Sequence, residues 1–131
     1  MVDATPANLL AAIAQAKAEN KMLLLEFGSS DSCAPCMALE AQVFSKPEFL
    51  EYARSNLVFV RIDFPDRSKL PADVTATNAL LGVQFDIKGF PTFIALNHEG
   101  REAWRTEGVT KSQIDLKGFM GLIETVRSQQ K

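Results

Sequence analysis

Two cysteines are the residues best placed to do chemistry in this sequence of 131 residues, and they lie three positions apart, at Cys33 and Cys36. Residues three apart on a helix lie about 5–6 Å from each other, so a disulfide can close between them without backbone movement. A total of two cysteines excludes a multi-disulfide scaffold and a four-thiolate zinc site within one chain. The spacing therefore predicts a pair that cycles between dithiol and disulfide.

The helix expected to start at the cysteines gives them different roles. If Cys33 caps this helix, its sulfur faces the unpaired N–H groups of the first turn and the positive end of the helix dipole, which both favour a thiolate. Pro35 has no N–H, so the remaining donors for that thiolate are the backbone N–H and the thiol of Cys36. We expect Cys33 to be the attacking nucleophile and Cys36 to resolve the mixed disulfide.

Glu26 is the one charged residue within the apolar run Met22–Phe27. A buried carboxyl without a cation keeps its proton and has a raised pKa. Glu26 is then available as the proton acceptor and donor for Cys36 during exchange. The alternative interpretation is a charge that reaches the rim of the sheet.

The charges near the cysteines bear on the redox potential. Asp31 and Glu40 are the only charged residues from position 27 to position 45, so no cation close in sequence stabilises the thiolate. Strong oxidants owe their potential to a heavily stabilised reduced form. We therefore expect a Cys33 pKa in the upper part of the roughly 3.5–7.5 range of activated cysteines, and a reductase or isomerase rather than a strong oxidant.

Hydrophobic periodicity predicts the elements that must position these residues. Helices are expected over Ala7–Asn20, Cys33–Phe44, Pro47–Ser55, about Ala72–Phe85, and Ser112–Gln129. Strands are expected over Met22–Phe27, Leu57–Asp63, Thr92–Leu96 and Arg101–Arg105. We expect Ser45 and Ser112 to cap the helices that follow them. The order predicts an α/β fold, a central mixed sheet flanked by helices on both faces, in a single domain over residues 1–131.

Composition and charge exclude several classes of protein. Apolar residues make up 47% and charged residues 23%, as in ordinary globular proteins. The net charge of −2 gives no electrostatic footprint for nucleic acid or an anionic membrane. No run approaches the roughly 18 apolar residues of a membrane helix, and residues 1–20 lack the pattern of a signal peptide. We expect no nucleic-acid partner and no membrane insertion.

Five segments carry a resemblance to a known family: Leu23–Phe27, Cys33–Cys36, Val43–Phe49, Val60–Asp63 and Lys88–Thr92. With them the chain resembles the thioredoxin superfamily over about residues 7–127, and specifically the redox domain of bacterial thiol:disulfide interchange proteins. The resemblance implies a thioredoxin fold, with Pro91 in a cis peptide bond and packed against the cysteine pair. We expect no bound cofactor and no metal.

The resemblance also implies a site for protein substrates. In the family the loop at the proline offers backbone groups to the substrate peptide in a strand-like manner, so Phe90, Pro91 and Thr92 are expected to contact substrate. We expect further contacts at Ala34 and Pro35. The implied partners are protein thiols or disulfides, bound through a transient mixed disulfide, and an upstream electron-donor protein. A monomer in an extracytoplasmic compartment such as the periplasm is favoured over a cytoplasmic protein.

The sequence departs from the family pattern in four places. Ser32 stands where the family usually has Trp before the first cysteine. Glu26 replaces the commoner Asp and is one residue further from the cysteines. Phe59 stands where a Lys often pairs with that acid, although Arg61 follows two residues on. An insertion at about Asp66–Leu81 lengthens the connection between the cysteines and the proline loop.

The cysteine pair has three other interpretations. A static disulfide closing so small a loop stabilises by only about 2 kcal/mol. Half of a zinc site between subunits lacks a nearby His. A third alternative is a protein-binding adaptor or chaperone-like module whose redox activity is incidental. Outside the pair, we expect His98 to be a surface residue and Trp104 to serve in packing.

Overall fold

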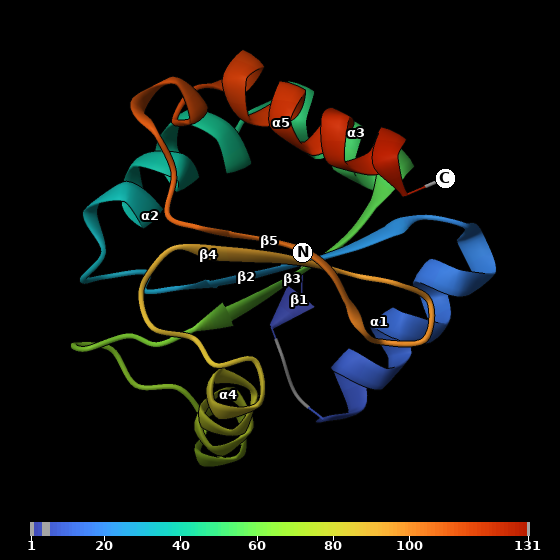
Figure 1. Ribbon diagram of the computed structural model, residues 1–131. Helices are drawn as coiled ribbons and strands as arrows, with labels where there is room; N and C mark the ends of the chain where they lie inside the picture. The colour runs from blue at the N-terminus through green and yellow to red at the C-terminus, as the bar shows by residue number, and fades with distance from the viewer. Residues whose placement is uncertain (1, 4–5, 131) are drawn as a thin grey trace.

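A five-stranded mixed sheet forms the centre of the computed structural model, which describes residues 2–3 and 6–130 (Figure 1). The strands are β1 (Val2–Asp3), β2 (Met22–Gly28), β3 (Leu57–Asp63), β4 (Thr92–Leu96) and β5 (Glu102–Glu107), in the order β1-β3-β2-β4-β5. β3 is parallel to β1 and β2, whereas β4 is antiparallel to β2 and β5. The expected mixed sheet is confirmed. The two-residue strand β1 was not expected, because so short a strand has no periodicity to detect.

Helices cover both faces of the sheet, as predicted (Figure 1). They are α1 (Pro6–Glu19), α2 (Ala34–Leu39), α3 (Pro47–Asn56), α4 (Ala72–Gln84) and α5 (Leu116–Gln129). Helices α2, α3 and α5 lie on one face, and α1 and α4 lie on the other. No helix in residues 2–3 and 6–130 is long and apolar enough to cross a membrane.

The alternation of side chains along the strands divides the core into two layers. Leu24, Phe59 and Phe93 pack toward α2, α3 and α5. Leu23 and Leu25 pack toward α1 and α4, together with the apolar residues on the same face of β3 and β4. Every residue of β2 is buried, as expected for a strand covered on both sides. Glu26 is two residues from Leu24, so its side chain points to the face that carries α2.

Three local expectations were wrong. The helix expected over Cys33–Phe44 is an α-helix only to Leu39 and continues as a π-helix, η1 (Glu40–Phe44). Ser45 ends η1 and donates to the carbonyl of Ala41, so it does not cap α3, which begins after Lys46. Ser112 is taken up by a short 3-10 turn, and Asp115 caps α5 by accepting the N–H of Lys117. Both serine hydroxyls are engaged by residues that precede them, Ser45 by the carbonyl of Ala41 and Ser112 by the hydroxyl of Thr110.

Candidate active site

The cysteine pair lies at the start of α2 as a disulfide, with the two Cα atoms 5.2 Å apart. Cys33 is the N-cap residue of α2, and the backbone N–H of Cys36 donates to the Cys33 sulfur over 3.2 Å. Cys33 is 8% exposed and Cys36 is 3% exposed. The expected cap and the expected donor are both present, so the helix N-terminus is positioned to stabilise negative charge on Cys33.

Glu26 lies in β2, the strand that precedes the cysteines, and forms an ion pair with Arg61. The two residues are partners in the β2–β3 register, and Arg61 Nε donates to Glu26 Oε1 over 2.6 Å. Arg61 Nη1 also donates over 2.8 Å to Oε2 of Glu40, which is the first residue of η1. The expectation of a buried acid without a cation was therefore wrong, because strand pairing brings Arg61 across from 35 positions away in sequence.

Burial nevertheless dominates the ionisation of Glu26. Its side chain is almost fully enclosed, and this loss of hydration raises its pKa although Arg61 acts in the opposite direction. The carboxyl oxygen Oε2 has no hydrogen-bond partner among the described residues. One oxygen of Glu26 is thus held by Arg61, and the other accepts no hydrogen bond from the described residues.

The free oxygen of Glu26 and the sulfur of Cys36 approach the same glycine. A Cβ atom added to Gly28 would lie 3.0 Å from Cys36 Sγ and 3.8 Å from Glu26 Oε2. A cavity of about 100 Å³ is lined by Glu26, Gly28, Cys36 and Arg61, with further residues of the β2 and β3 ends. A polar cavity of this size has room for water, which could carry a proton between carboxyl and thiol.

The proline loop lies at the same end of β2 as the cysteines, since Thr92 pairs with Phe27. The Phe90–Pro91 peptide bond is cis, as the resemblance implied. Pro91 is buried, and the Thr92 hydroxyl is turned inward, where it donates to the carbonyl of Gly89 over 2.7 Å. Phe90, by contrast, is 39% exposed. Of the three residues expected to contact substrate, Phe90 is the one that presents its side chain to the surface.

Ala34 and Pro35 lie in the first turn of α2, between the cysteines. Ala34 is exposed and Pro35 is half-buried. Ser32, directly before Cys33, is also exposed, and its hydroxyl lies 2.6 Å from that of Ser29. The exposed side chains directly before and after Cys33 are therefore small, and one of them is polar.

Asp31 was not singled out from sequence, yet it joins two loops at this site. Its carboxylate accepts the backbone N–H groups of Asp66, Arg67 and Ser68, all at 2.8–2.9 Å. These bonds, the one from Ser68 foremost, hold the pKa of Asp31 well below its usual range. The start of the insertion is thereby fastened to the loop that leads into Cys33.

Trp104 serves in packing as expected, whereas His98, which was expected at the surface, is half-buried. His98 Nε2 lies 3.2 Å from the carbonyl of Lys21, which directly precedes β2, at the end of the strand away from the cysteines. Trp104 is half-buried and packs against the core layer that contains Phe93. No group of three or more metal-binding side chains occurs in the described part of the chain.

Comparisons with known proteins agree with this geometry. Residues 9–119 match the family model of a thioredoxin-like domain. The chain is 30% identical over 94 residues to the disulfide bond reductase DsbH of Chlamydia pneumoniae, across 72% of this chain and 57% of that protein. It is 32% identical over 124 residues to the thiol:disulfide interchange protein DsbD 2 of Pseudomonas aeruginosa, across 95% of this chain and 19% of that protein.

Solved structures support the same fold. A structure described as DsbH oxidoreductase superposes with a TM-score of 0.80 at 24% identity, covering 95% of this chain and 83% of the other. The C-terminal domain of Neisseria meningitidis DsbD, in its oxidised form, gives a TM-score of 0.63 at 19% identity, covering 95% of this chain and 98% of the other. The chain spans 57% of the length of one curated relative and 19% of the other.

Proposed function

Because this chain belongs to the thioredoxin-like domain family, we propose that it is a protein thiol–disulfide oxidoreductase that works as a reductase or isomerase. The observation that carries the proposal is the capped cysteine pair, in which the N–H of Cys36 donates to the Cys33 sulfur at the start of α2. The names of the relatives, a disulfide bond reductase and a thiol:disulfide interchange protein, support the same activity.

In the first step of the proposed reaction, the Cys33 thiolate attacks one sulfur of a protein disulfide. The partner's S–S bond breaks as the bond to Cys33 forms, and the released partner thiolate takes up a proton. In the second step Cys36 loses its proton and attacks the Cys33 sulfur. This step forms the Cys33–Cys36 disulfide and releases the second partner sulfur as a thiolate, which takes up a proton. Overall the partner gains two electrons and two protons, which balance the proton of Cys36 and the proton that Cys33 lost on becoming a thiolate.

Glu26 is proposed as the group that accepts the proton of Cys36. Its free oxygen and the Cys36 sulfur flank Gly28 at a shared cavity, so one water can link them. Burial raises the pKa of Glu26 toward neutral pH, and a carboxyl with such a pKa can both accept and return a proton. Arg61 is the positioning residue, because it holds the other oxygen of Glu26 and leaves this one toward the cavity.

Substrate is proposed to bind across the proline loop and the first turn of α2. Phe90 presents an exposed ring, Ala34 an exposed methyl group, and the adjoining Pro35 and Pro91 rigid backbone. Thr92 supports this loop through its bond to Gly89 and through its pairing with Phe27 of β2 and Glu107 of β5. An extended segment of a polypeptide that contains the reacting disulfide is the ligand that suits such a surface.

The remaining parts of the proposal concern partners and place. We propose a single-domain monomer that receives electrons from an upstream donor protein by the same mixed-disulfide exchange. Extracytoplasmic compartments hold the protein disulfides that such an enzyme acts on, which favours the periplasm over the cytoplasm. Cell fractionation followed by immunoblotting tests the compartment, and recovery with cytoplasmic markers would contradict it.

The activity is tested by insulin reduction in the presence of dithiothreitol, with wild type compared to Cys33→Ser. The wild type is expected to accelerate precipitation of the insulin B chain, and the variant is expected to fall to the uncatalysed rate. Equal rates for the two proteins would favour a protein-binding adaptor or chaperone-like module with incidental redox chemistry.

A further inference from the structure

Two phenylalanine rings stack against each other at the end of the sheet near the cysteines, where β3 ends and β4 begins. The rings of Phe64 and Phe90 have centroids 5.3 Å apart and planes inclined by only 18°. Phe64 directly follows β3, and Phe90 directly precedes the cis peptide bond of Pro91. We call these two residues the aromatic pair. Phe64 is half-buried, whereas Phe90 is exposed, so Phe64 forms the inner member of the pair.

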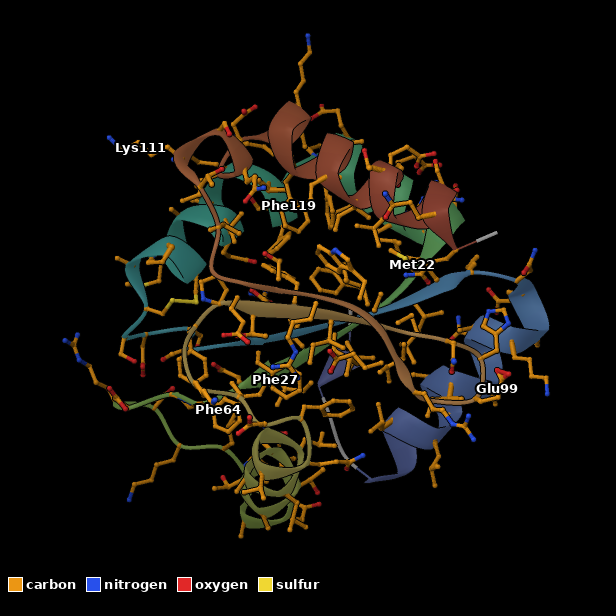
Figure 2. The ribbon with its side chains drawn as sticks, viewed as in Figure 1. Met22, Phe27, Phe64, Glu99, Lys111 and Phe119 are labelled. Atoms are coloured by element: carbon orange, nitrogen blue, oxygen red, sulfur yellow. A yellow bond between two sulfur atoms is a disulfide. The ribbon has the colours of Figure 1, made fainter. Side chains whose placement is uncertain are left out.

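Several contacts hold Phe64 in place. Its N–H donates to the carbonyl of Gly28 over 2.9 Å and so continues the β2–β3 ladder by one residue. Its ring lies against α4, since its Cζ atom is 3.3 Å from the position of a Cβ on Gly82. Asp31 fixes the segment that follows, through the N–H groups of residues 66–68. Figure 2 shows Phe64 between the sheet and α4, on the side of the molecule where the yellow disulfide bond lies.

Gly28 links the aromatic pair to the cysteines. Its carbonyl accepts the N–H of Phe64, while its Cα faces the sulfur of Cys36. Ser32, which directly precedes Cys33, is exposed and carries a hydroxyl group, so it adds no large apolar side chain to the surface. Among the described residues, Phe90 is the one aromatic side chain among the exposed large apolar ones. Exposed apolar area near the disulfide therefore comes from the Phe90 ring of the proline loop and from Met37, which directly follows Cys36 on α2.

We propose that Phe64 is a positioning residue for substrate selection, which holds the Phe90 ring beside Pro91 so that the site prefers polypeptide disulfides with a bulky apolar residue next to the reacting cysteine. A ring supported from behind loses less rotational freedom on binding than an unsupported one. Burial of an apolar substrate side chain against the supported ring then increases affinity for that class of substrate. The inference rests on the proposed function, because it assumes that a protein disulfide docks at Cys33.

The test uses two peptides that share one intramolecular disulfide and differ only in the residue next to the attacked cysteine, Leu in one and Ser in the other. The variants are Phe64→Ala and Phe64→Leu, with Leu80→Ala as a matched control on an exposed apolar residue of α4. Hydroxyethyl disulfide, which is too small to reach the aromatic pair, reports the chemical step alone. Thermal unfolding of each variant identifies any that is not folded.

Wild type and Leu80→Ala are expected to prefer the Leu peptide in kcat/KM by about tenfold, which corresponds to about 1.4 kcal/mol. Phe64→Ala is expected to lose this preference through a higher KM, with the rate on hydroxyethyl disulfide unchanged. Phe64→Leu keeps the fold if the alanine variant does not, and is expected to retain only part of the preference.

Two different failures can be told apart. If wild type reduces neither the peptides nor hydroxyethyl disulfide, the proposed function fails, and this inference fails with it. If wild type is active but the folded Phe64 variants keep the full preference for the Leu peptide, only the role of Phe64 is overturned. A wild type that is active without preference between the peptides overturns the proposed selectivity in the same way.

Discussion

Arg61 lies between two carboxylates, with Nε 2.6 Å from Glu26 on the neighbouring strand and Nη1 2.8 Å from Glu40 on η1. The guanidinium also lies over the ring of Phe44, 5.2 Å from its centroid. One cation thus serves two acids beside the cavity that Cys36 lines. Arg61 is thus a positive charge near the cysteine pair, but Glu26 and Glu40 already neutralise it. The expectation that the pKa of Cys33 lies in the upper part of the range of activated cysteines therefore stays a prediction.

The first prediction concerns proton transfer by Glu26. Glu26→Gln removes the proton acceptor and keeps the shape of the side chain, so resolution of the mixed disulfide by Cys36 should slow by about 10²-fold or more at neutral pH. In wild type this rate should rise with pH through the raised pKa of Glu26, because only the carboxylate accepts a proton. The variant should lack that rise. Stopped-flow measurement of the resolving step across pH checks both effects.

Glu26 also affects stability, with a defined sign. Its pKa is raised in the folded state, so the folded protein holds this proton to higher pH than the unfolded chain does. The favourable contribution is fully present below the ordinary carboxyl pKa and is lost as pH rises through the folded value. Glu26→Gln should therefore gain stability relative to wild type as pH rises from acid to neutral. Urea unfolding of both proteins at several pH values measures this difference; a difference independent of pH would contradict it.

The second prediction concerns Arg61. Arg61→Met leaves Glu26 and Glu40 without their shared donor, which should reduce the free energy of unfolding by up to about 3 kcal/mol, the lower end for a buried pair. The pKa of Glu26 should rise further, so the pH profile of the resolving step should move to higher pH. Arg54→Met, which breaks an exposed ion pair with Glu51, is the control and should change stability by less than about 1 kcal/mol. Equal effects of the two substitutions would contradict a special role for Arg61.

The third prediction concerns Asp31. Its pKa is lowered in the folded state, so its stabilising effect is present above the ordinary aspartate pKa and is lost as pH falls toward the folded value. Asp31→Asn should weaken the acceptor for the N–H groups of residues 66–68 and increase their hydrogen exchange. Amides in the centre of β2 should keep their protection. Exchange measured by NMR decides the point, and unchanged protection at residues 66–68 would show that the carboxylate is not needed there.

The local features of the fold followed well from sequence. The apolar run of β2 and the cap at Cys33 depend on neighbours within a few residues, and such patterns can be read directly. The partnership of Glu26 with Arg61 depends on the register of two strands, so local patterns do not show it, and only the family pattern, in which a Lys often pairs with this acid, drew attention to Arg61. The Phe64–Phe90 stack likewise joins two segments that are far apart in the sequence, and Asp31, in a third loop, holds the residues that follow Phe64.

Gly28 constrains this region without any unusual backbone angle of its own. Its neighbours, and not its conformation, exclude a side chain, because an added methyl group would press on the Cys36 sulfur at 3.0 Å. Glycine weakens a strand by leaving more freedom in the unfolded chain, but alanine would not recover that stability here, because its methyl group would have to displace the Cys36 sulfur. Substitutions at position 28 should therefore disturb the packing of the sheet and the position of the Cys36 sulfur together, so that selection for thermal stability and selection for activity should both retain glycine.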